Sequence, residues 1–185
     1  MAHRLCPWWL GHLLANPVRR WFQNPRALLQ PLVAEGMTVL EPGPGMGFFT
    51  LELALLVGPS GRVVAIDVQP RMLAGLARRA TRAGLAGRIE MRQAQADRMG
   101  TDDLEARVDF VLAFAMVHEL PDLAGFFAEA ARALKPGAKM LVAEPRGHVT
   151  SEDFAQTLAL AKRAGLSVES EPIIRSSRAA LLRKH

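Results

Sequence analysis

Short apolar runs alternate along the chain with longer segments in which apolar residues recur at helical spacing. Each run is bounded by glycine, proline or charged residues, which is typical of strands buried on both faces of a parallel sheet. Runs of this kind occupy residues 39–40, 63–66, 108–114 and 139–143. The intervening segments predict helices over residues 48–57, 70–83, 123–134 and roughly 150–163. This alternation favours an α/β domain with a mostly parallel sheet.

Three further strands complete the predicted pattern. Residues 88–93 form a short, partly polar run, and residues 166–170 follow the helix stop at Gly165. The last apolar stretch, residues 179–182, arrives without a crossover helix, so we expect it to run antiparallel to its neighbours. Residues 150–153 show a pattern similar to a capping box, which predicts the start of the last helix.

A glycine-punctuated turn joins the first strand to the first helix. The strand ends in Glu41, and Gly43, Gly45 and Gly47 follow at alternate positions. Glycines at this spacing let the backbone approach a ligand and adopt positive φ, and the helix behind them begins with unpaired N–H groups. The turn therefore predicts a nucleotide-type cofactor site. Asp67 ends the second strand, where a carboxylate can accept from both ribose hydroxyls.

The glycine spacing separates two classes of cofactor. The dinucleotide fingerprint has its third small residue where Phe48 stands, which disfavours a nicotinamide oxidoreductase even though that class also uses an acid such as Asp67. The E-x-G-x-G-x-G sequence that begins at Glu41 instead resembles the first motif of class I S-adenosylmethionine-dependent methyltransferases. Residues 132–145, RALKPGAKMLVAEP, resemble the same region of methyltransferases that act on small molecules.

The resemblance implies an α/β, Rossmann-like fold over residues 35–185. It implies a seven-stranded, mostly parallel sheet of order 3-2-1-4-5-7-6, with one antiparallel strand and helices on both faces, and S-adenosylmethionine as the cofactor. The expected cofactor-binding residues are Glu41, Gly43, Gly45, Gly47, Asp67, Val68, Gln95, Ala96 and Phe114. Gln95 is expected to accept from the adenine amino group and Ala96 to offer its backbone N–H, with Asp97 as the alternative to Gln95.

Candidate acid–base residues follow the fourth and fifth strands. His118 and Glu119 come after residues 108–114, and His148 comes after residues 139–143. In open α/β sheets, ligands bind beyond the carboxyl ends of the strands. Because the sulfonium already activates the methyl group, the protein mainly has to align the acceptor, and one of these side chains would remove a proton from an oxygen or nitrogen acceptor. A role for His118 in capping or packing the loop before the next helix is an equal alternative.

The expected acceptor is a small, partly apolar molecule. The fourth strand is followed by Ala-Met-Val-His, whereas the exocyclic-amine DNA and RNA methylases carry an Asn/Asp-Pro-Pro-aromatic tetrapeptide there, so base methylation is disfavoured. Cys6 lies away from the predicted strand ends, which disfavours a cysteine nucleophile. Arg175 either reaches an anionic acceptor or is a solvated loop residue.

Residues 1–34 are expected to form a separate N-terminal helical arm or lid. The segment is apolar, broken by prolines, and holds Trp8, Trp9 and Trp21. We expect it to help form the acceptor pocket. Peripheral membrane contact through these tryptophans is a further expectation, and it belongs to the rival hypothesis of a non-catalytic donor-binding or scaffold protein.

Composition narrows the class of partner. The net charge of +5 would permit nucleic-acid binding, but the arginines gather on the helix over residues 70–83 and its exit without interleaved aromatic side chains. A solvated face is expected there, and no nucleic-acid partner. A chain of 185 residues, half of them hydrophobic, is long enough for one domain with a full core.

Cysteine content and apolar run length bear on the compartment. The single cysteine permits no intramolecular disulfide, and the histidine, glutamate and cysteine spacings match no metal-ligand pattern, so no metal is expected. No apolar run reaches the roughly 18 residues of a membrane span. The N-terminal segment lacks a clean signal-peptide cleavage site, so we expect a cytoplasmic location.

Overall fold

The computed structural model of the chain describes residues 24–95 and 97–185. The predicted arm is therefore covered only from residue 24 onward, and its three tryptophans lie outside the described residues, as does Ala96. The described part divides into two compact units, residues 24–94 and residues 95–185.

The first unit begins with a short helix and contains three parallel strands. Its elements are α3 (Pro25–Leu29), β1 (Thr38–Pro42), α4 (Thr50–Leu56), β2 (Arg62–Asp67), α5 (Pro70–Arg82), the 3₁₀ turn η1 (Ala86–Arg88) and β3 (Ile89–Gln93). β2 pairs in parallel with β1 on one side and with β3 on the other. The apolar residues of β2 are buried, as expected for a central strand that is covered on both faces.

The second unit contains four strands and two long helices. Its elements are η2 (Asp102–Leu104), β4 (Val108–Phe114), η3 (Val117–Glu119), α6 (Leu123–Ala133), β5 (Leu134–Pro145), α7 (Ser151–Arg163), β6 (Leu166–Ser170) and β7 (Ser177–Lys184). β4 and β5 are parallel, and β7 runs antiparallel to both β5 and β6.

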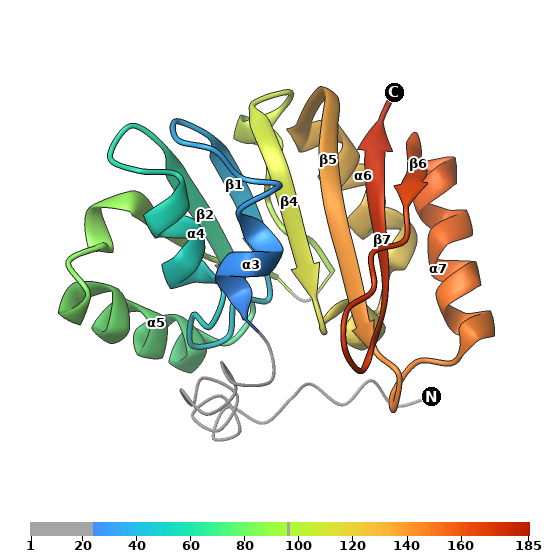
Figure 1. Ribbon diagram of the computed structural model, residues 1–185, viewed down its shortest axis with the longest axis horizontal. Coiled ribbons are helices and arrows are strands. Elements are labelled where there is room, and N and C mark those ends of the chain that lie inside the picture. The colour runs from blue at the N-terminus through green and yellow to red at the C-terminus, as the bar shows by residue number, and fades with distance from the viewer. Residues whose placement is uncertain (1–23, 96) are drawn as a thin grey trace. The chain divides into compact units, whose positions relative to one another are not determined.

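The seven strands form one sheet in the order β3-β2-β1-β4-β5-β7-β6, with helices around it (Figure 1). The predicted fold class and strand order are thus confirmed, and β7 is the antiparallel strand that the missing crossover helix indicated. Among the described residues, no helix has both the length and the apolar character needed to cross a membrane. Within residues 24–95 and 97–185, no group of three or more His, Cys, Asp or Glu side chains is arranged to hold a metal ion.

Most element boundaries differ from the predicted ones by one or two residues, and the differences in β5 and α4 have a clear structural reason. β5 begins at Leu134 and not at residue 139, because Leu134 pairs with Val108 of β4 before the register shifts. The Lys-Pro-Gly sequence at residues 135–137 lies between the predicted helix and strand and is an irregular part of β5, with Gly137 at φ +75°. α4 begins at Thr50 and not at residue 48, because the turn that precedes it extends through Phe49.

The start of α7 is fixed by the capping box that the sequence predicts. The Asp153 N–H donates to Thr150 Oγ1 over 3.1 Å, and the Thr150 N–H donates to Asp153 Oδ2 over 3.2 Å. The hydrogen bonds from Thr150 also lower the pKa of the Asp153 carboxyl. This cap holds the point at which the chain enters the helix after the loop that follows β5.

Candidate active site

The glycine turn after β1 adopts backbone conformations that suit glycine. Gly45 has φ +55° and Gly47 has φ +85°, in the left-handed region that L side chains rarely adopt. A Cβ on Gly47 would clash with Leu76 of α5, whereas a Cβ on Gly45 would meet no described atom within 4 Å. Close packing therefore demands glycine at position 47, and the backbone at Gly45 lies open to the approach of a ligand.

Helix α5 contacts this turn through a hydrogen bond and through close packing. Arg79 Nη1 donates to the Met46 carbonyl oxygen over 2.5 Å. The Met46 side chain packs on Gly75, where a Cβ would lie only 2.8 Å from Met46 Cγ. The prediction of a solvated arginine face is therefore wrong for Arg79, although Arg78 and Arg82 are exposed as expected.

Glu41 is buried at the carboxyl end of β1. Its exposed fraction is 3%. Its Oε2 atom is buried and has no hydrogen-bond partner among the described residues. Burial raises the pKa of Glu41 to about 8, and the charge of the Asp67 carboxylate acts in the same direction. Because an unsatisfied buried oxygen is costly, this carboxyl is suited to receive a hydrogen-bond donor or a cation from a ligand.

Asp67 lies at the carboxyl end of β2 and is 8% exposed. Its Oδ1 atom accepts from the Gln69 N–H over 2.8 Å, and its main-chain oxygen accepts from the Ala94 N–H over 3.1 Å. Both hydrogen bonds fix the strand end that carries the carboxylate. Val68 follows it and is half-buried.

In the second unit, the loop after β3 is a tight turn. The Gln95 N–H donates to the Arg98 carbonyl oxygen over 3.2 Å, and the Arg98 N–H donates to the Gln95 carbonyl oxygen over 3.4 Å. The side chains of Gln95 and Asp97 are both exposed, so the choice between them for the adenine stays open. Glu129 of α6 holds the next part of the loop, because it accepts from the Met99 and Gly100 N–H groups over 3.2 and 3.0 Å.

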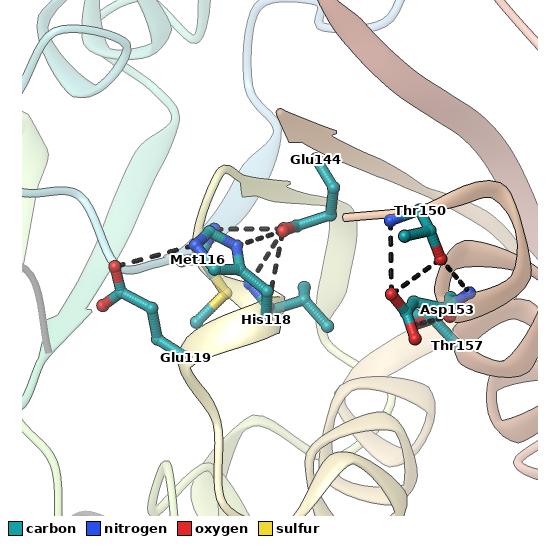
Figure 2. A network of polar contacts seen from close by, with 8 residues as sticks. Met116, His118, Glu119, Glu144, Thr150, Asp153 and Thr157 are labelled. Atoms are coloured by element: carbon teal, nitrogen blue, oxygen red, sulfur yellow. Dashed lines mark hydrogen bonds and ion pairs between the residues drawn. The ribbon is translucent and has the colours of Figure 1, made fainter. Parts of the chain in front are cut away.

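Glu144, at the end of β5, organises the turn that follows β4 (Figure 2). Its side chain is only 2% exposed. Its Oε1 atom accepts from the Met116 N–H over 3.1 Å and from the Val117 N–H over 2.9 Å. Its Oε2 atom accepts from the His118 N–H over 3.4 Å and also contacts His118 Nδ1. One buried carboxylate thus fixes three successive residues of the turn.

The His118 ring lies between two carboxylates (Figure 2). Nδ1 faces Glu144, and Nε2 is 3.9 Å from Glu119 Oε1. The His148 ring meets the His118 ring edge to face, with centroids 5.3 Å apart. The hydrogen bond to Glu144 raises the pKa of His118, partial burial opposes this, and the charges of Glu144 and Glu119 add to the rise.

His118 is not the cap of the following helix. α6 is capped by Asp122, whose Oδ1 accepts from the Gly125 N–H over 2.9 Å. The structure brings all three predicted acid–base residues together, since Glu119 and His148 both lie beside His118. Sequence reasoning missed the role of Glu144. The available signal was an acid at the end of an apolar strand, the same signal that singled out Glu41 and Asp67.

The loop that carries His148 is fastened to the beginning of β7. The Arg146 N–H donates to the Ser176 carbonyl oxygen over 3.0 Å, and Arg146 Nε donates to the Ser177 carbonyl oxygen over 3.1 Å. His148 itself is exposed, and its N–H donates to the Pro145 carbonyl oxygen over 3.0 Å. The loop is therefore held by main-chain groups of a distant segment.

A family model described as a methyltransferase domain matches residues 34–174, which is well over half of the chain. The chain belongs to the class I S-adenosylmethionine-dependent methyltransferases. The predicted family, enzyme class and cofactor are thereby confirmed.

This methyltransferase is similar to relatives with different named substrates. It is 34% identical to a ribosomal protein L11 methyltransferase of Pelotomaculum thermopropionicum, over 74% of this chain and 42% of that protein. It is 30% identical to an arsenite methyltransferase of Halobacterium salinarum, over 65% and 30% of the two chains. It is 31% identical to the ubiquinone/menaquinone biosynthesis C-methyltransferase UbiE of Pasteurella multocida, over 60% of this chain and 41% of that protein. The methyltransferase thus spans less than half the length of these curated relatives.

A solved structure covers nearly the whole of this methyltransferase. A SAM-dependent methyltransferase from Aquifex aeolicus superposes with a TM-score of 0.87 and 25% identity, covering 98% of this chain and 100% of that one. The family resemblance of the E-x-G-x-G-x-G motif predicts this same Rossmann-like fold.

The residues of the first unit fit the cofactor of the methyltransferase. S-adenosylmethionine carries an ammonium group, a sulfonium and a ribose. Glu41 presents a buried oxygen without a described partner, the backbone at Gly45 is open, and Asp67 ends its strand with a carboxylate. In the second unit, Phe114 is half-buried at the end of β4.

Proposed function

We propose that this methyltransferase transfers a methyl group to a small, partly apolar acceptor, and that His118 acts as the general base. The observation that carries the proposal is the pairing of His118 with buried Glu144, since a histidine oriented by a carboxylate is a common acid–base arrangement. Glu119 and His148 remain the alternative bases, because both lie beside the same ring.

We propose that the first unit binds the donor. Glu41 receives the ammonium group, the turn with Gly43, Gly45 and Gly47 accommodates the ligand at the open backbone of Gly45, and Asp67 accepts from the ribose hydroxyls. Val68 is assigned to the adenosine part, and the same role for Gln95, Ala96 and Phe114 stays a prediction from the family resemblance. When bound, the donor supplies an electrophilic methyl group on sulfonium.

The size of the acceptor is inferred from the chain and its relatives. In the described part, only η3 and α6 lie between β4 and β5, so no inserted domain is present there to recognise a large substrate. Two of the relatives are named for arsenite and for ubiquinone/menaquinone biosynthesis, whereas one is named for a ribosomal protein. Protein L11 is therefore kept as a comparison acceptor in the test.

Donor binding is tested by titration calorimetry with S-adenosylmethionine, S-adenosylhomocysteine and NAD. We expect the first two to bind and NAD not to bind. Asp67→Ala should weaken binding about 10-fold to 100-fold, because hydrogen bonds to charged groups contribute about 1.5–3 kcal/mol. Glu105→Ala removes an exposed acid and is the matched control. Equal affinity in the two variants would refute the role of Asp67.

The chemical step is tested with a panel of phenols, amines, thiols, quinones and protein L11, with formation of S-adenosylhomocysteine as the readout. We expect turnover of a small member of the panel. His118→Gln should then lower kcat by about 100-fold or more, which is the usual contribution of a general base. Full activity in this variant, together with loss of activity in His148→Gln, would transfer the role to His148.

A further inference from the structure

Glu144 contacts both the main chain of the turn after β4 and the ring of His118. Its Oε1 atom accepts from the Met116 and Val117 N–H groups, and its Oε2 atom accepts from the His118 N–H and contacts His118 Nδ1. Accepting from three main-chain N–H groups is typical of an ionised carboxylate, which has no hydrogen of its own to donate. The side chain is 2% exposed, so water does not compete for these contacts.

The contact with Glu144 sets the tautomer of His118. Since the carboxylate only accepts, the ring must carry its hydrogen on Nδ1. In the neutral imidazole, Nε2 then has a lone pair and no hydrogen. Glu119 Oε1 lies 3.9 Å from Nε2, which exceeds the length of a hydrogen bond. Nε2 is therefore the ring atom that can take a proton from a ligand.

The surroundings of the ring favour a strong base. The charged groups that face it are Glu144 from β5 and Glu119 from η3, and the neighbouring titratable ring is His148 from the loop after β5. Both carboxylates stabilise the imidazolium that forms when Nε2 takes a proton. The His118 side chain is 20% exposed, so the ring is partly open to a ligand, whereas Glu144 is not.

We propose that Glu144 is a positioning residue that holds His118 with its hydrogen on Nδ1, so that Nε2 receives a proton from an acceptor bearing an O–H or N–H group. This rests on the proposed function and narrows its substrate class. As the acceptor oxygen or nitrogen bonds to the methyl carbon, its proton goes to His118 Nε2. The electron pair of the broken carbon–sulfur bond stays on sulfur. Acceptors that react through an existing lone pair, without losing a proton, fall outside this class.

The first test is nitrogen-detected NMR of the histidine rings in the full-length chain, without cofactor or acceptor. Long-range proton–nitrogen correlations identify which ring nitrogen carries hydrogen, and His118 is assigned through its bonds to the backbone. We expect the neutral ring of His118 to carry its hydrogen on Nδ1. A neutral ring with hydrogen on Nε2, or an even mixture of the two forms, would overturn the proposal without any variant having to fold.

A variant then tests whether Glu144 is the cause. Glu144→Gln keeps an oxygen that can accept from the main chain but removes the charge. The pKa of His118 should fall, because the hydrogen bond and the close negative charge that raise it are weakened or lost. Glu171→Gln alters an exposed loop acid and is the matched control. An unchanged His118 pKa in a Glu144→Gln protein that binds S-adenosylmethionine normally would contradict the proposal.

Turnover separates the positioning role from the proposed function. With an O–H or N–H acceptor, Glu144→Gln should lower kcat at least 10-fold with little change in KM, and should shift the acidic limb of the pH–rate profile toward lower pH. Failure to find any methyl acceptor would remove the proposed function while the NMR result still decides the role of Glu144. Equal rates for wild type and His118→Gln with every acceptor would overturn the substrate class.

Discussion

Burial of Glu41 should make the free energy of unfolding depend strongly on pH. The folded protein holds a proton on this carboxyl up to a pKa of about 8, whereas the unfolded chain releases it near the ordinary value of 4.5. The unfolded state therefore binds fewer protons above pH 4.5, so this contribution to stability is complete below that pH and is lost as the pH rises toward 8. Between about pH 5 and about pH 8 the loss amounts to about 3–4 kcal/mol, because each unit of difference in pKa corresponds to 1.36 kcal/mol.

The variant Glu41→Gln isolates this effect, because its side chain has a similar shape and does not titrate. Urea unfolding of both proteins at several pH values gives the free energy of unfolding from the midpoint and slope. All other titrating groups are shared, so the difference between the two curves reports on Glu41. We expect the wild type to lose about 3–4 kcal/mol relative to the variant over this range. Parallel curves would refute the assignment of a buried, protonated Glu41.

The same carboxyl should couple donor binding to proton release. One unit below a pKa of about 8, roughly 90% of the Glu41 side chains carry a proton. If the ammonium of S-adenosylmethionine pairs with the carboxylate, binding at about pH 7 releases close to 0.9 proton per site. Calorimetry in buffers with different ionisation enthalpies measures this number. A release of zero in wild type, or an equal release in Glu41→Gln, would separate Glu41 from the donor.

Three further substitutions test the elements that hold the site. Gly47→Ala should destabilise the fold by more than Gly84→Ala. Both positions have positive φ, which costs about 1–3 kcal/mol for alanine, but only at position 47 does the new Cβ also clash with Leu76 of α5. Equal losses of the free energy of unfolding in urea would refute the packing argument. Arg79→Ala should weaken S-adenosylmethionine binding several-fold in calorimetry, while exposed Arg78→Ala should not. Asp122→Ala should cost about 1 kcal/mol of stability by loss of the α6 cap, and an unchanged Tm would contradict that role.

The strands and the glycine turn after β1 could be predicted because their sequence signals are local. A continuous apolar run such as residues 63–66 needs burial on both faces wherever the chain places it, and the structure buries it. The capping box of α7 lies within four residues, and the antiparallel direction of β7 follows from the missing crossover helix. The order of the strands came from the family resemblance and not from the apolar pattern.

The contacts that shape the site could not be predicted, because they join residues far apart in the chain. Glu144 and the turn it holds are separated by 26 residues, and Arg79 reaches a carbonyl 33 residues away. Nothing in the neighbouring sequence distinguishes such an arginine from an exposed one. The early start of β5 has the same origin, since pairing of Leu134 with Val108 overrides the local signal of the Lys-Pro-Gly sequence.

The attachment of Arg146 to the beginning of β7 has a consequence for how specificity can change. The loop with His148 takes its position from main-chain oxygens of Ser176 and Ser177, not from their side chains. Substitutions at those two positions that preserve the backbone should leave the loop in place. Insertions or deletions in residues 171–176, where Ser176 has φ +61°, would instead move the carbonyl groups and reposition His148. A change in the length of the segment before β7 should therefore alter the choice of acceptor without changing any residue of the glycine turn after β1.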